Sequence, residues 1–436
     1  MIKTLGCKVN QFESEAISAA LVADGWEEAA AGPVSLCVVN TCTVTGRAAM
    51  QSRQEVRRCR RENPGALVIA AGCYATVDPE ELRATGCLDL VVAHQAKHLI
   101  PDLVRKKAFS FFAARPPLMI DENDHPGAFP RYRPDPAGAS DRARPYLKIQ
   151  DGCEAFCTYC IVPHARGRSV SMPEDEVLAL LGEYALSGYG EVVLTGIHLG
   201  AYGHDLPGSS SLLDLLRRID RQKNLPRVRL SSIEPLELTD EIIDLVAASD
   251  RFCDHFHLPL QSGQDQILEK MGRPYRSDFF AGRVDRIKKR LPQAAIGADL
   301  LVGFPGEDAV AFEATHSLIS RLPLTYLHVF PYSPRRGTPA FDYPGQVTPD
   351  LIKERCRLLR DLGEAKKQEF ASSRVGTTAV IRVEEKRDPQ SGCLKGVTSN
   401  YLTVLLDGGD ELKGDLVKVL IGENLRGLRV RAYIQG

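Results

Sequence analysis

The stretch Asp151-Gly-Cys-Glu-Ala-Phe-Cys-Thr-Tyr-Cys-Ile-Val-Pro-His-Ala-Arg-Gly-Arg168 decides how the rest of the chain is interpreted. Its cysteines, Cys153, Cys157 and Cys160, are separated by three and two residues, so one loop can place three thiolates around a metal centre. A four-iron cluster has four irons to ligate, and three sulfurs leave one iron open. Because an open metal position is a reactive position, we expect a reactive metal centre at this loop.

Tyr159 precedes the last of these cysteines, and with it the loop resembles that of the radical S-adenosylmethionine superfamily. In that superfamily the open iron chelates the amino and carboxylate groups of S-adenosylmethionine, and electron transfer cleaves it to a 5′-deoxyadenosyl radical. The resemblance implies a 4Fe-4S cluster and S-adenosylmethionine as cofactors, with Tyr159 close to the cofactor.

Two other interpretations of the loop remain open from its residues. His164 lies four residues past Cys160, so a Cys3His zinc site is possible on ligand identity. Structural zinc loops usually pair one C-x2-C with a distant second pair, which this loop lacks. Three thiols without a metal in a buried turn are the third interpretation.

Length and composition limit the number of domains and the classes of function that are possible. The chain has 436 residues, which suggests about three domains, and a net charge of −1, which argues against a bulk polycation. Any nucleic-acid contact would have to come from local basic patches. Neither a membrane-length apolar run nor a signal-peptide core is evident, so we expect a cytoplasmic protein with no membrane partner. Its 12 cysteines are then reduced, which favours metal ligands over disulfides.

The first hundred residues repeat one device three times. Short apolar strands, near 2–7, 36–42 and 66–73, each end in a cysteine and precede a helix, expected over 13–24, 46–62 and from about 78. Alternating strands and helices predict a parallel sheet, and ligands gather at the carboxyl ends of such strands. Three cysteines would converge there, as metal ligands or as small buried residues beside turns. The three are Cys7, Cys42 and Cys73, whereas Cys37 and Cys59 are interpreted as structural.

The motifs around these cysteines resemble the N-terminal domain of the methylthiotransferases, radical enzymes that act on tRNA or a ribosomal protein. They are Gly6-Cys-Lys-Val-Asn-Gln11, Asn40-Thr-Cys-Thr-Val-Thr45 and Ala71-Gly-Cys-Tyr-Ala75. The first is similar to the branch that acts on threonylcarbamoyladenosine at position 37 of tRNA. The resemblance implies that Cys7, Cys42 and Cys73 hold a second 4Fe-4S cluster.

A basic helix is expected over 46–62. Arg53, Arg57 and Arg60 recur at helical spacing and could share one face. A face that contacts phosphate and a plain solvated surface are equally compatible with this pattern.

We predict an α/β protein of four segments. An open parallel α/β domain over 1–105 is followed by a proline-rich connector over 106–144, with possible short strands at 109–112 and 118–120. Six strand–helix units over 145–371 predict a partial (βα)6 barrel, the known fold of radical S-adenosylmethionine enzymes. Short strands over 372–436 predict a small antiparallel barrel that resembles the RNA-binding TRAM domain. That last segment carries ten Lys/Arg and eight Asp/Glu.

Polar or glycine residues end several strands of the central segment. By resemblance they contact S-adenosylmethionine, while turn chemistry alone would also explain each of them. Gly196 would let a ligand approach the backbone closely. His198, His257 and His328 lie on or after strands and receive no role. The cofactor candidates are Thr195, Gly196, Ser232, Glu234, Gln261 and Asp299.

Four arginines are candidates for contacts with tRNA phosphate or the target base: Arg166, Arg168, Arg335 and Arg336. Exposed loop arginines without a partner are the plain alternative. The predicted activity is 2-methylthiolation of threonylcarbamoyladenosine in tRNA. By resemblance, one S-adenosylmethionine methylates sulfur at the second cluster, and another yields the radical that takes hydrogen from carbon 2 of adenine.

The expected partners are tRNA and an electron-donor protein such as a flavodoxin or ferredoxin, and the sulfur donor is not specified. Two rivals remain. The same chemistry could act on isopentenyladenosine or on an aspartate of a ribosomal protein, which feeding each substrate would distinguish. A non-catalytic zinc-bearing RNA-binding protein would instead contain zinc and consume no S-adenosylmethionine.

Overall fold

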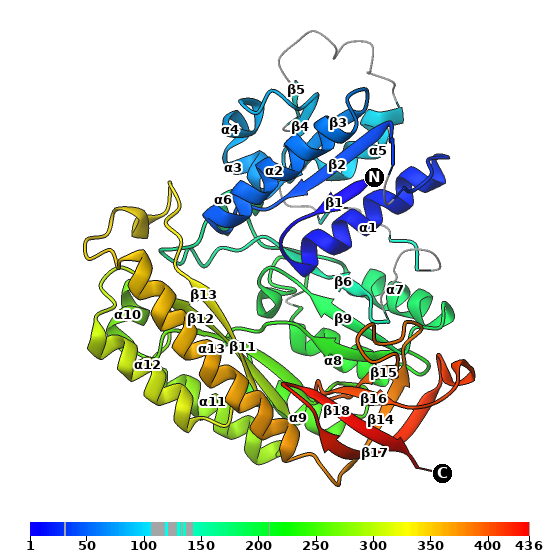
Figure 1. Cartoon of the computed structure of the whole chain (residues 1–436), viewed down its shortest axis with the longest axis vertical. Helices are drawn as coiled ribbons and strands as arrows, with labels where there is room; N and C mark the ends of the chain where they lie inside the picture. The colour runs from blue at the N-terminus through cyan, green and yellow to red at the C-terminus, as the bar shows by residue number, and fades with distance from the viewer. Residues whose placement is uncertain are drawn as a thin grey trace. The chain divides into compact units, whose positions relative to one another are not determined.

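The computed structural model describes residues 1–29, 32–105, 118–120, 129–130, 132, 134–136, 143–208 and 210–435. They form two compact units (Figure 1). Unit 1 comprises 1–187, 194–212 and 333–341, and unit 2 comprises 188–193, 213–332 and 342–436. Each unit is described by itself. The predicted domain boundaries near 105, 144 and 371 remain predictions.

Unit 1 begins with a five-stranded parallel sheet in the order β1-β2-β3-β4-β5. Nearly all residues of the central strands are buried, as the apolar runs of a covered parallel sheet require. The predicted open parallel sheet is thus confirmed. Its strands are β1 (Ile2–Thr4), β2 (Leu36–Thr41), β3 (Leu67–Gly72), β4 (Leu90–Val92) and β5 (Leu118–Ile120).

Helices alternate with these strands. α2 (Gly46–Glu62) has the predicted bounds, because the Thr45 side chain caps it by accepting from the Ala48 amide. α1 (Lys8–Ala23) starts directly after Cys7, earlier than predicted. The third expected helix, from about 78, begins at Pro79 as predicted, since proline favours a helix start. A further short helix directly after β3 was not predicted. The remaining helices are α3 (Cys73–Val77), α4 (Pro79–Arg83), η1 (Lys97–Leu99) and α5 (Ile100–Arg105).

The expected connector contributes to this sheet. β5 lies within 106–144 and pairs in parallel with β4. The other expected strand, 109–112, falls outside the described residues. A strand at 118–120 was therefore predicted correctly, but its place as the fifth strand of the sheet was not foreseen.

The rest of unit 1 carries the cysteine loop. It contains β6 (Tyr146–Lys148), β7 (Gln150–Asp151), α6 (Val162–Arg166), β8 (Val170–Ser171) and α7 (Glu174–Leu186). β7 and β8 pair antiparallel, which brings the two ends of the cysteine loop together. A short 3-10 helix, η3 (Leu199–Ala201), follows β9 (Glu191–Thr195).

β9, β10 (Arg227–Leu230) and β6 form a three-stranded sheet in the order β10-β9-β6. In unit 2 the bridges Val228–Phe252 and Ser232–His257 link β10 to the strand that follows it. That strand, β11 (His255–Gln261), continues in parallel to β12 (Ala295–Val302) and β13 (Tyr326–Pro331). The six strands follow one another in chain order, as in the predicted partial barrel.

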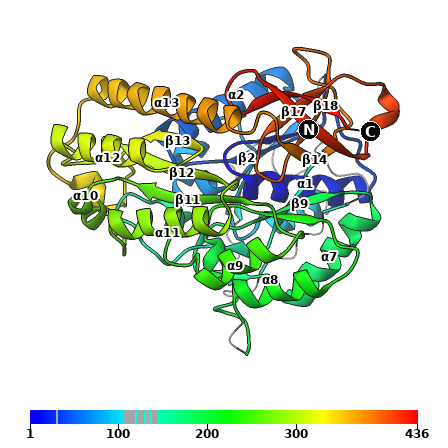
Figure 2. The same ribbon diagram turned by 90° about the horizontal axis from the view of Figure 1, so that it is seen from below.

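Helices of unit 2 cover these strands. Figure 2 shows α9 and α11 side by side along β11. α13 packs on β13, where Gly363 allows close approach because an added Cβ would lie 3.3 Å from Leu327 Cβ. The side chains of Thr239, Gln264 and Asp308 cap the helices that they precede. The helices are α8 (Leu212–Arg221), α9 (Asp240–Ala248), α10 (Asp265–Lys270), α11 (Ser277–Arg290), α12 (Ala309–Arg321), η4 (Pro339–Asp342) and α13 (Pro349–Ser372).

The C-terminal strands form a closed barrel in the order β14-β15-β16-β18-β17. Its core joins Phe370 and Ala371 of α13. The predicted antiparallel barrel needs one correction: β16 and β18 pair in parallel. This pair closes the barrel, since β17 stands between the two strands in the chain. The elements are β14 (Thr378–Val383), β15 (Leu394–Val397), β16 (Thr403–Leu406), η5 (Asp410–Leu412), β17 (Leu416–Asn424) and β18 (Arg429–Ile434).

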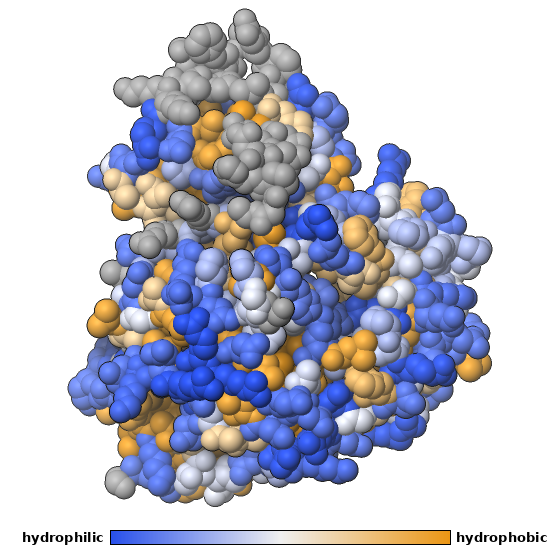
Figure 3. Space-filling view, turned by 180° about the vertical axis from the view of Figure 1, so that it is seen from behind, coloured by the Kyte–Doolittle hydropathy of each residue, from blue (hydrophilic) through white to orange (hydrophobic). Residues whose placement is uncertain are grey.

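The face drawn in Figure 3 is mostly hydrophilic, with hydrophobic residues scattered across its described part. Scattered apolar residues are normal on a folded surface. Within the described residues, none of the helices has both the length and the apolar character needed to cross a membrane.

Candidate functional site

The first cysteine triad lies on the loop between β7 and α6. Cys157 is buried, and Cys153 and Cys160 are partly exposed. The Cys153 amide donates to the Gly167 carbonyl at 3.1 Å, and the Cys160 amide donates to the Cys157 carbonyl at 2.9 Å. Gly152, at φ +73°, is where the loop passes so close to Arg168 that a side chain would strike its backbone. The loop therefore turns tightly and presents its three thiols together.

The second triad gathers at the carboxyl ends of β1, β2 and β3, which are adjacent parallel strands. Cys7, Cys42 and Cys73 each follow one of these strands. A Cβ on Gly6 would lie 2.8 Å from Cys42 Sγ, so the first strand end approaches the second closely. Burial raises the pKa of Cys42 to about 11, and Cys73 and Cys7 add to this rise. The three cysteines thus follow neighbouring strand ends, and their role as metal ligands remains a prediction.

The spacing of the sulfur atoms bears on the kind of metal. Tetrahedral zinc, with Zn–S bonds of about 2.3 Å, holds its sulfurs about 3.8 Å apart. Among the described residues, neither triad brings its three sulfurs within 4.8 Å of one another, and no set that includes His164 does so. His164 is exposed and meets Phe156 edge-on instead. Neither triad therefore shows the close sulfur spacing of a single tetrahedral zinc ion.

The first cofactor candidates lie in unit 1. Thr195 is buried, and its carbonyl accepts from the Ile149 amide at 2.9 Å. A Cβ on Gly196 would lie 2.8 Å from Gln150 Oε1, which accepts from the His198 amide. The Gln150 side chain therefore leaves no room for a side chain at position 196, which explains the glycine there. Tyr159 is partly exposed within the cysteine loop.

The other cofactor candidates lie in unit 2, at the ends of its parallel strands. Ser232 is exposed and bridges His257. Gln261 ends β11 with φ +69°, a conformation rare for a residue with a side chain. Glu234 is engaged by Arg273, which is buried. The roles of these residues as cofactor ligands remain predictions.

Asp299 has a different setting from the one expected. Its Oδ1 atom accepts from His257 Nε2 at 2.8 Å and lies 3.2 Å from His328 Nδ1. Burial alone would raise the pKa of Asp299, but the two imidazoles hold it well below its ordinary value. Tyr326 joins His257 at 3.0 Å and His255 at 2.8 Å, which extends the chain of hydrogen bonds. Asp299 therefore orients two histidines that the sequence left unassigned.

The four candidate tRNA contacts separate into two classes. Arg168 and Arg336 are exposed, and Arg168 pairs with Glu154 at 3.2 Å. Arg335 is partly buried and donates to Thr43 Oγ1. The prediction for Arg166 is wrong, because its side chain is only 1% exposed and binds buried acidic groups.

The basic helix α2 is likewise only partly available. Arg53 pairs with Glu81 at 2.6 Å, and Arg60 pairs with Asp89 at 2.5 Å. Arg57 is exposed on the same helix. Two of the three arginines expected on one face thus form ion pairs within the N-terminal part of the chain.

Comparison with known proteins shows which family this chain belongs to. Residues 1–93 match the family described as "Uncharacterized protein family UPF0004", and residues 147–319 match the radical SAM superfamily. A threonylcarbamoyladenosine tRNA methylthiotransferase of Bacillus subtilis is 38% identical, over 96% of this chain and 92% of the relative. Its counterpart in Aquifex aeolicus is 34% identical, over 96% of this chain and 99% of the relative. This chain belongs to the radical S-adenosylmethionine methylthiotransferase family.

Other relatives of this methylthiotransferase carry a different name. A tRNA-2-methylthio-N(6)-dimethylallyladenosine synthase of Zymomonas mobilis is 32% identical, over 96% of this chain and 93% of the relative. The fold also matches a radical S-adenosylmethionine methyltransferase, TsrM, of Kitasatospora setae, with a TM-score of 0.57 at 17% identity. That match covers 87% of this chain and 76% of the other. The enzyme is a radical S-adenosylmethionine enzyme, and it uses S-adenosylmethionine and 4Fe-4S clusters.

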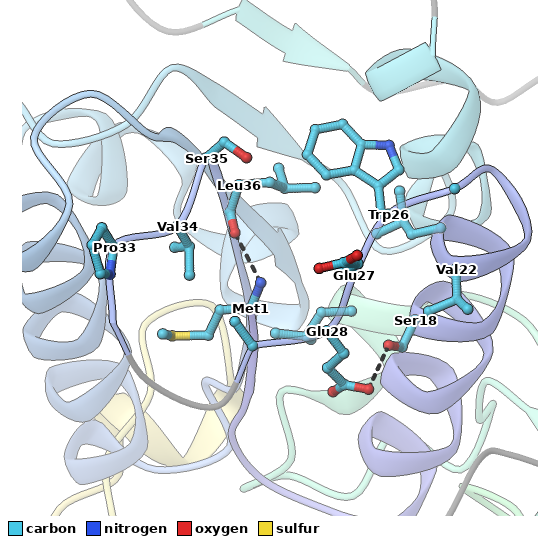
Figure 4. A pocket seen from close by; sticks show the side chains of 14 residues that line it. Met1, Ser18, Val22, Trp26, Glu27, Glu28, Pro33, Val34, Ser35 and Leu36 are labelled. Carbon is cyan, nitrogen blue, oxygen red and sulfur yellow. Dashed lines mark hydrogen bonds between the residues drawn. The ribbon is translucent and has the colours of Figure 1, made fainter.

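A cavity of about 380 Å³ in this methylthiotransferase lies away from both triads. It is lined by the start of β2 and the end of α1, with Trp26 beside Glu27 (Figure 4). The Met1 amine donates to the Leu36 carbonyl at 3.0 Å there. Because β1 and β2 begin at this cavity and end at Cys7 and Cys42, it belongs to the opposite edge of the sheet.

Sequence reasoning missed a set of buried charges in unit 1. Lys148 and Asp151 lie in the short strands before the cysteine loop, and both are almost fully buried. The sequence did offer a signal, because two charged residues within an otherwise apolar stretch indicate buried charges. Such charges are almost never buried without partners of opposite charge. The partners, which include Glu13 and Lys97, are far away in the chain and could not be paired from sequence.

Proposed function

We propose that this enzyme converts threonylcarbamoyladenosine at position 37 of tRNA to its 2-methylthio derivative. The observation that carries the proposal is the match over nearly the whole chain to enzymes of that name at 34–38% identity. Relatives named for dimethylallyladenosine are 32% identical. The presence of two cysteine triads in unit 1 supports the reaction class.

Each triad would hold one cluster. Cys153, Cys157 and Cys160 offer three thiolates from one loop, and the second triad offers three from strand ends. Three protein ligands leave one iron of each cluster open. When bound, the clusters supply one-electron cleavage of S-adenosylmethionine and a site for the sulfur that is transferred. The ligand set proposed for the second cluster is Cys7, Cys42 and Cys73.

Other residues of the chain would bind and orient the substrates. The tight turn at Gly152 fixes the first loop, and Gly196 leaves room for Gln150 beside it. Candidate contacts with S-adenosylmethionine are Tyr159, Thr195, Ser232, Glu234 and Gln261, while Asp299 acts through His257 and His328. Arg168 and Arg336 are exposed and are proposed to contact tRNA phosphate, whereas Arg335 stands beside Thr43.

The test supplies reconstituted enzyme, S-adenosylmethionine and a chemical reductant to two tRNAs. One tRNA carries threonylcarbamoyladenosine and the other isopentenyladenosine, and nucleosides are identified by mass spectrometry. We expect the methylthio product from the first tRNA. Product from isopentenyladenosine alone would overturn the substrate assignment. Zinc without iron after anaerobic reconstitution would support the rival, a zinc-bearing RNA-binding protein.

Single substitutions separate the roles of the triads. Cys157→Ala is expected to abolish formation of 5′-deoxyadenosine, whereas Cys42→Ala keeps that cleavage but stops methylthiolation. Cys87→Ala is the matched control, because Cys87 is partly exposed and stands outside both triads. Methylthiolation by the Cys42→Ala enzyme would contradict the division of labour.

We further propose that a flavodoxin or ferredoxin donates the electron, since radical cleavage needs a one-electron reductant of low potential. A cytoplasmic location follows from the proposed tRNA substrate. The sulfur donor is left unassigned.

A further inference from the structure

Among the described residues of unit 1, six ionisable side chains form a fully enclosed network. Glu13 of α1 is its centre, with 0% exposure. Its carboxylate accepts from Lys97 of η1, from Lys148 of β6 at 2.9 Å and from Arg166 of α6 at 3.2 Å. The helix after Cys7 is thereby joined to the segment that follows the Cys153 loop. The full set is Glu13, His94, Lys97, Lys148, Asp151 and Arg166.

Asp151 is the second acidic member. It accepts from Lys148 at 2.8 Å and from Arg166 at 2.8 Å, and it lies 3.0 Å from His94 Nε2. The rings of Phe129 and Tyr132 close over the Lys148 ammonium at 5.1 Å and 4.6 Å. Such enclosure keeps water out, so every charge must be balanced inside the protein.

The charges of this network do not balance. Lys97, Lys148 and Arg166 contribute three positive charges, and Glu13 and Asp151 contribute two negative charges. Burial lowers the pKa of His94 to about 4, so the imidazole is neutral near pH 7. One positive charge is therefore left over. An unbalanced buried charge is costly, which points to an anion beside the network that completes it.

The surplus charge faces the second cysteine triad through two asparagines. Arg166 donates to Asn10 Oδ1 at 2.6 Å, and Asn10 Nδ2 donates to the carbonyls of Leu5 at 2.7 Å and Thr41 at 3.1 Å. Those residues lie just before Cys7 and Cys42. Arg166 thus holds the amide that ties two cysteine-bearing strand ends together.

The other cation reaches the same place by a second route. Lys97 Nζ lies 3.3 Å from Asn40 Oδ1, and Asn40 Nδ2 donates to the Asn10 carbonyl at 2.9 Å. A Cβ on Gly72, the residue before Cys73, would lie 2.7 Å from Asn40 Oδ1. Lys97 is therefore linked through Asn40 to the residue before Cys73. Both cations thus lie one side chain away from the strand ends that carry the triad.

We propose that Lys97 and Arg166 are the buried counter-charge of an anionic iron–sulfur centre held by Cys7, Cys42 and Cys73. The inference rests on the proposed function, because that function supplies the centre. Thiolate ligation makes such a centre anionic, and nearby charge is one of the properties that set its reduction potential. Lys97 and Arg166 are positioning residues that act through Asn40 and Asn10.

The test measures the midpoint potential of the second cluster alone. The full-length chain with alanine at Cys153, Cys157 and Cys160 is reconstituted, and the reduced cluster is followed by electron paramagnetic resonance during a redox titration. Lys97→Met is introduced into this background, with Lys97→Arg as the charge-conserving variant. Arg58→Gln is the control, since the Arg58 side chain on α2 is 54% exposed.

Loss of a nearby positive charge makes reduction less favourable. We expect Lys97→Met to change the ratio of reduced to oxidised cluster about tenfold at a fixed potential, which is a downward shift of about 59 mV for one electron. Lys97→Arg and Arg58→Gln should keep the parent value. Arg166→Gln should shift the potential downward as well, and Arg166→Lys should restore it.

Unchanged potentials in Lys97→Met and Arg166→Gln, with iron bound, would overturn the inference while the proposed function stands. A parent chain that binds no iron would overturn both. Loss of iron from Lys97→Met with iron retained in Lys97→Arg would support the inference. Loss of iron from both variants would overturn it, because Lys97→Arg keeps the positive charge.

Discussion

Replacing Glu13 by glutamine removes the carboxylate shared by three buried cations. Lys97, Lys148 and Arg166 all donate to it, and the surplus positive charge of the network rises from one to two. Breaking a buried ion pair by removing one partner costs about 3–5 kcal/mol. With a urea m-value of about 2–3 kcal/mol per M, the unfolding midpoint of the apo protein should fall by about 1–2.5 M.

Fluorescence of Trp26 is the assay for this change, because Trp26 is the only tryptophan of the chain and lies in unit 1 with Glu13. It therefore follows unfolding of the part of the molecule that contains the network. Glu80→Gln is the matched control, since the Glu80 side chain is 75% exposed and pairs with Arg83 at the surface. An exposed pair is worth about 0–1 kcal/mol. Equal midpoints for Glu13→Gln and Glu80→Gln would refute the reasoning.

The effect of Glu13 also has a defined pH dependence. Burial alone would raise the pKa of Glu13, but Lys148, Lys97 and Arg166 lower it far below its ordinary value. A carboxyl with a depressed folded pKa stabilises the protein above its unfolded pKa, about 4.3, and loses that contribution as pH falls further. The gap between parent and Glu13→Gln should therefore be full at pH 7 and shrink below about pH 4.

Three further outcomes are expected. Gly6→Ala places a Cβ 2.8 Å from Cys42 Sγ and should lower the reconstituted iron from about eight to about four atoms per chain. Gly25→Ala is the control, because Gly25 has a similar φ of +87° and open space around it, and it should keep the parent's iron content. Equal iron in the two variants would contradict this expectation. Asp299→Asn should cost about 1–3 kcal/mol of unit 2 stability by calorimetry, a cost that shrinks in acid because the Asp299 pKa is lowered. Arg168→Ala and Arg336→Ala should each weaken tRNA binding and reduce its salt slope by about one, and an unchanged slope would exclude a phosphate contact.

Local pattern predicted most of the fold. The bounds of β9, β12 and α2 follow from apolar runs, turn residues and a threonine cap, all of which act within a few residues of the chain. The parallel β16–β18 pair was missed because the strands that close a barrel depend on the arrangement of all its strands, not on local sequence. The position of β5 was missed for a related reason: three residues between prolines carry too little pattern to indicate which sheet they join.

The candidate site was predictable where chemistry is local and unpredictable where it depends on distant partners. Where three cysteines share one loop, or end three parallel strands of one sheet, the sequence alone predicts that they lie close together. A charged side chain does not, because burial is decided by residues elsewhere in the chain. Arg166 illustrates the difference: beside the cysteine loop it was interpreted as an RNA contact, yet Glu13 lies 153 positions away and holds it inside.

Arg166 also shows why the two triads share one network of charges. Its guanidinium meets Asp151, two residues before Cys153, and Asn10, three residues after Cys7. A buried guanidinium must satisfy its donors, so neither segment can shift without leaving a donor unpaired at a cost of several kcal/mol. Enzymes that carry out chemistry between two centres need both held in fixed geometry, because a misplacement of about 1 Å can cost about a hundredfold in rate. A surface salt bridge could not hold such a geometry, since exposed pairs contribute little. Burial of the charges is therefore what makes the network suitable for positioning, and the surplus cation ties that rigidity to the presence of an anion at Cys7, Cys42 and Cys73.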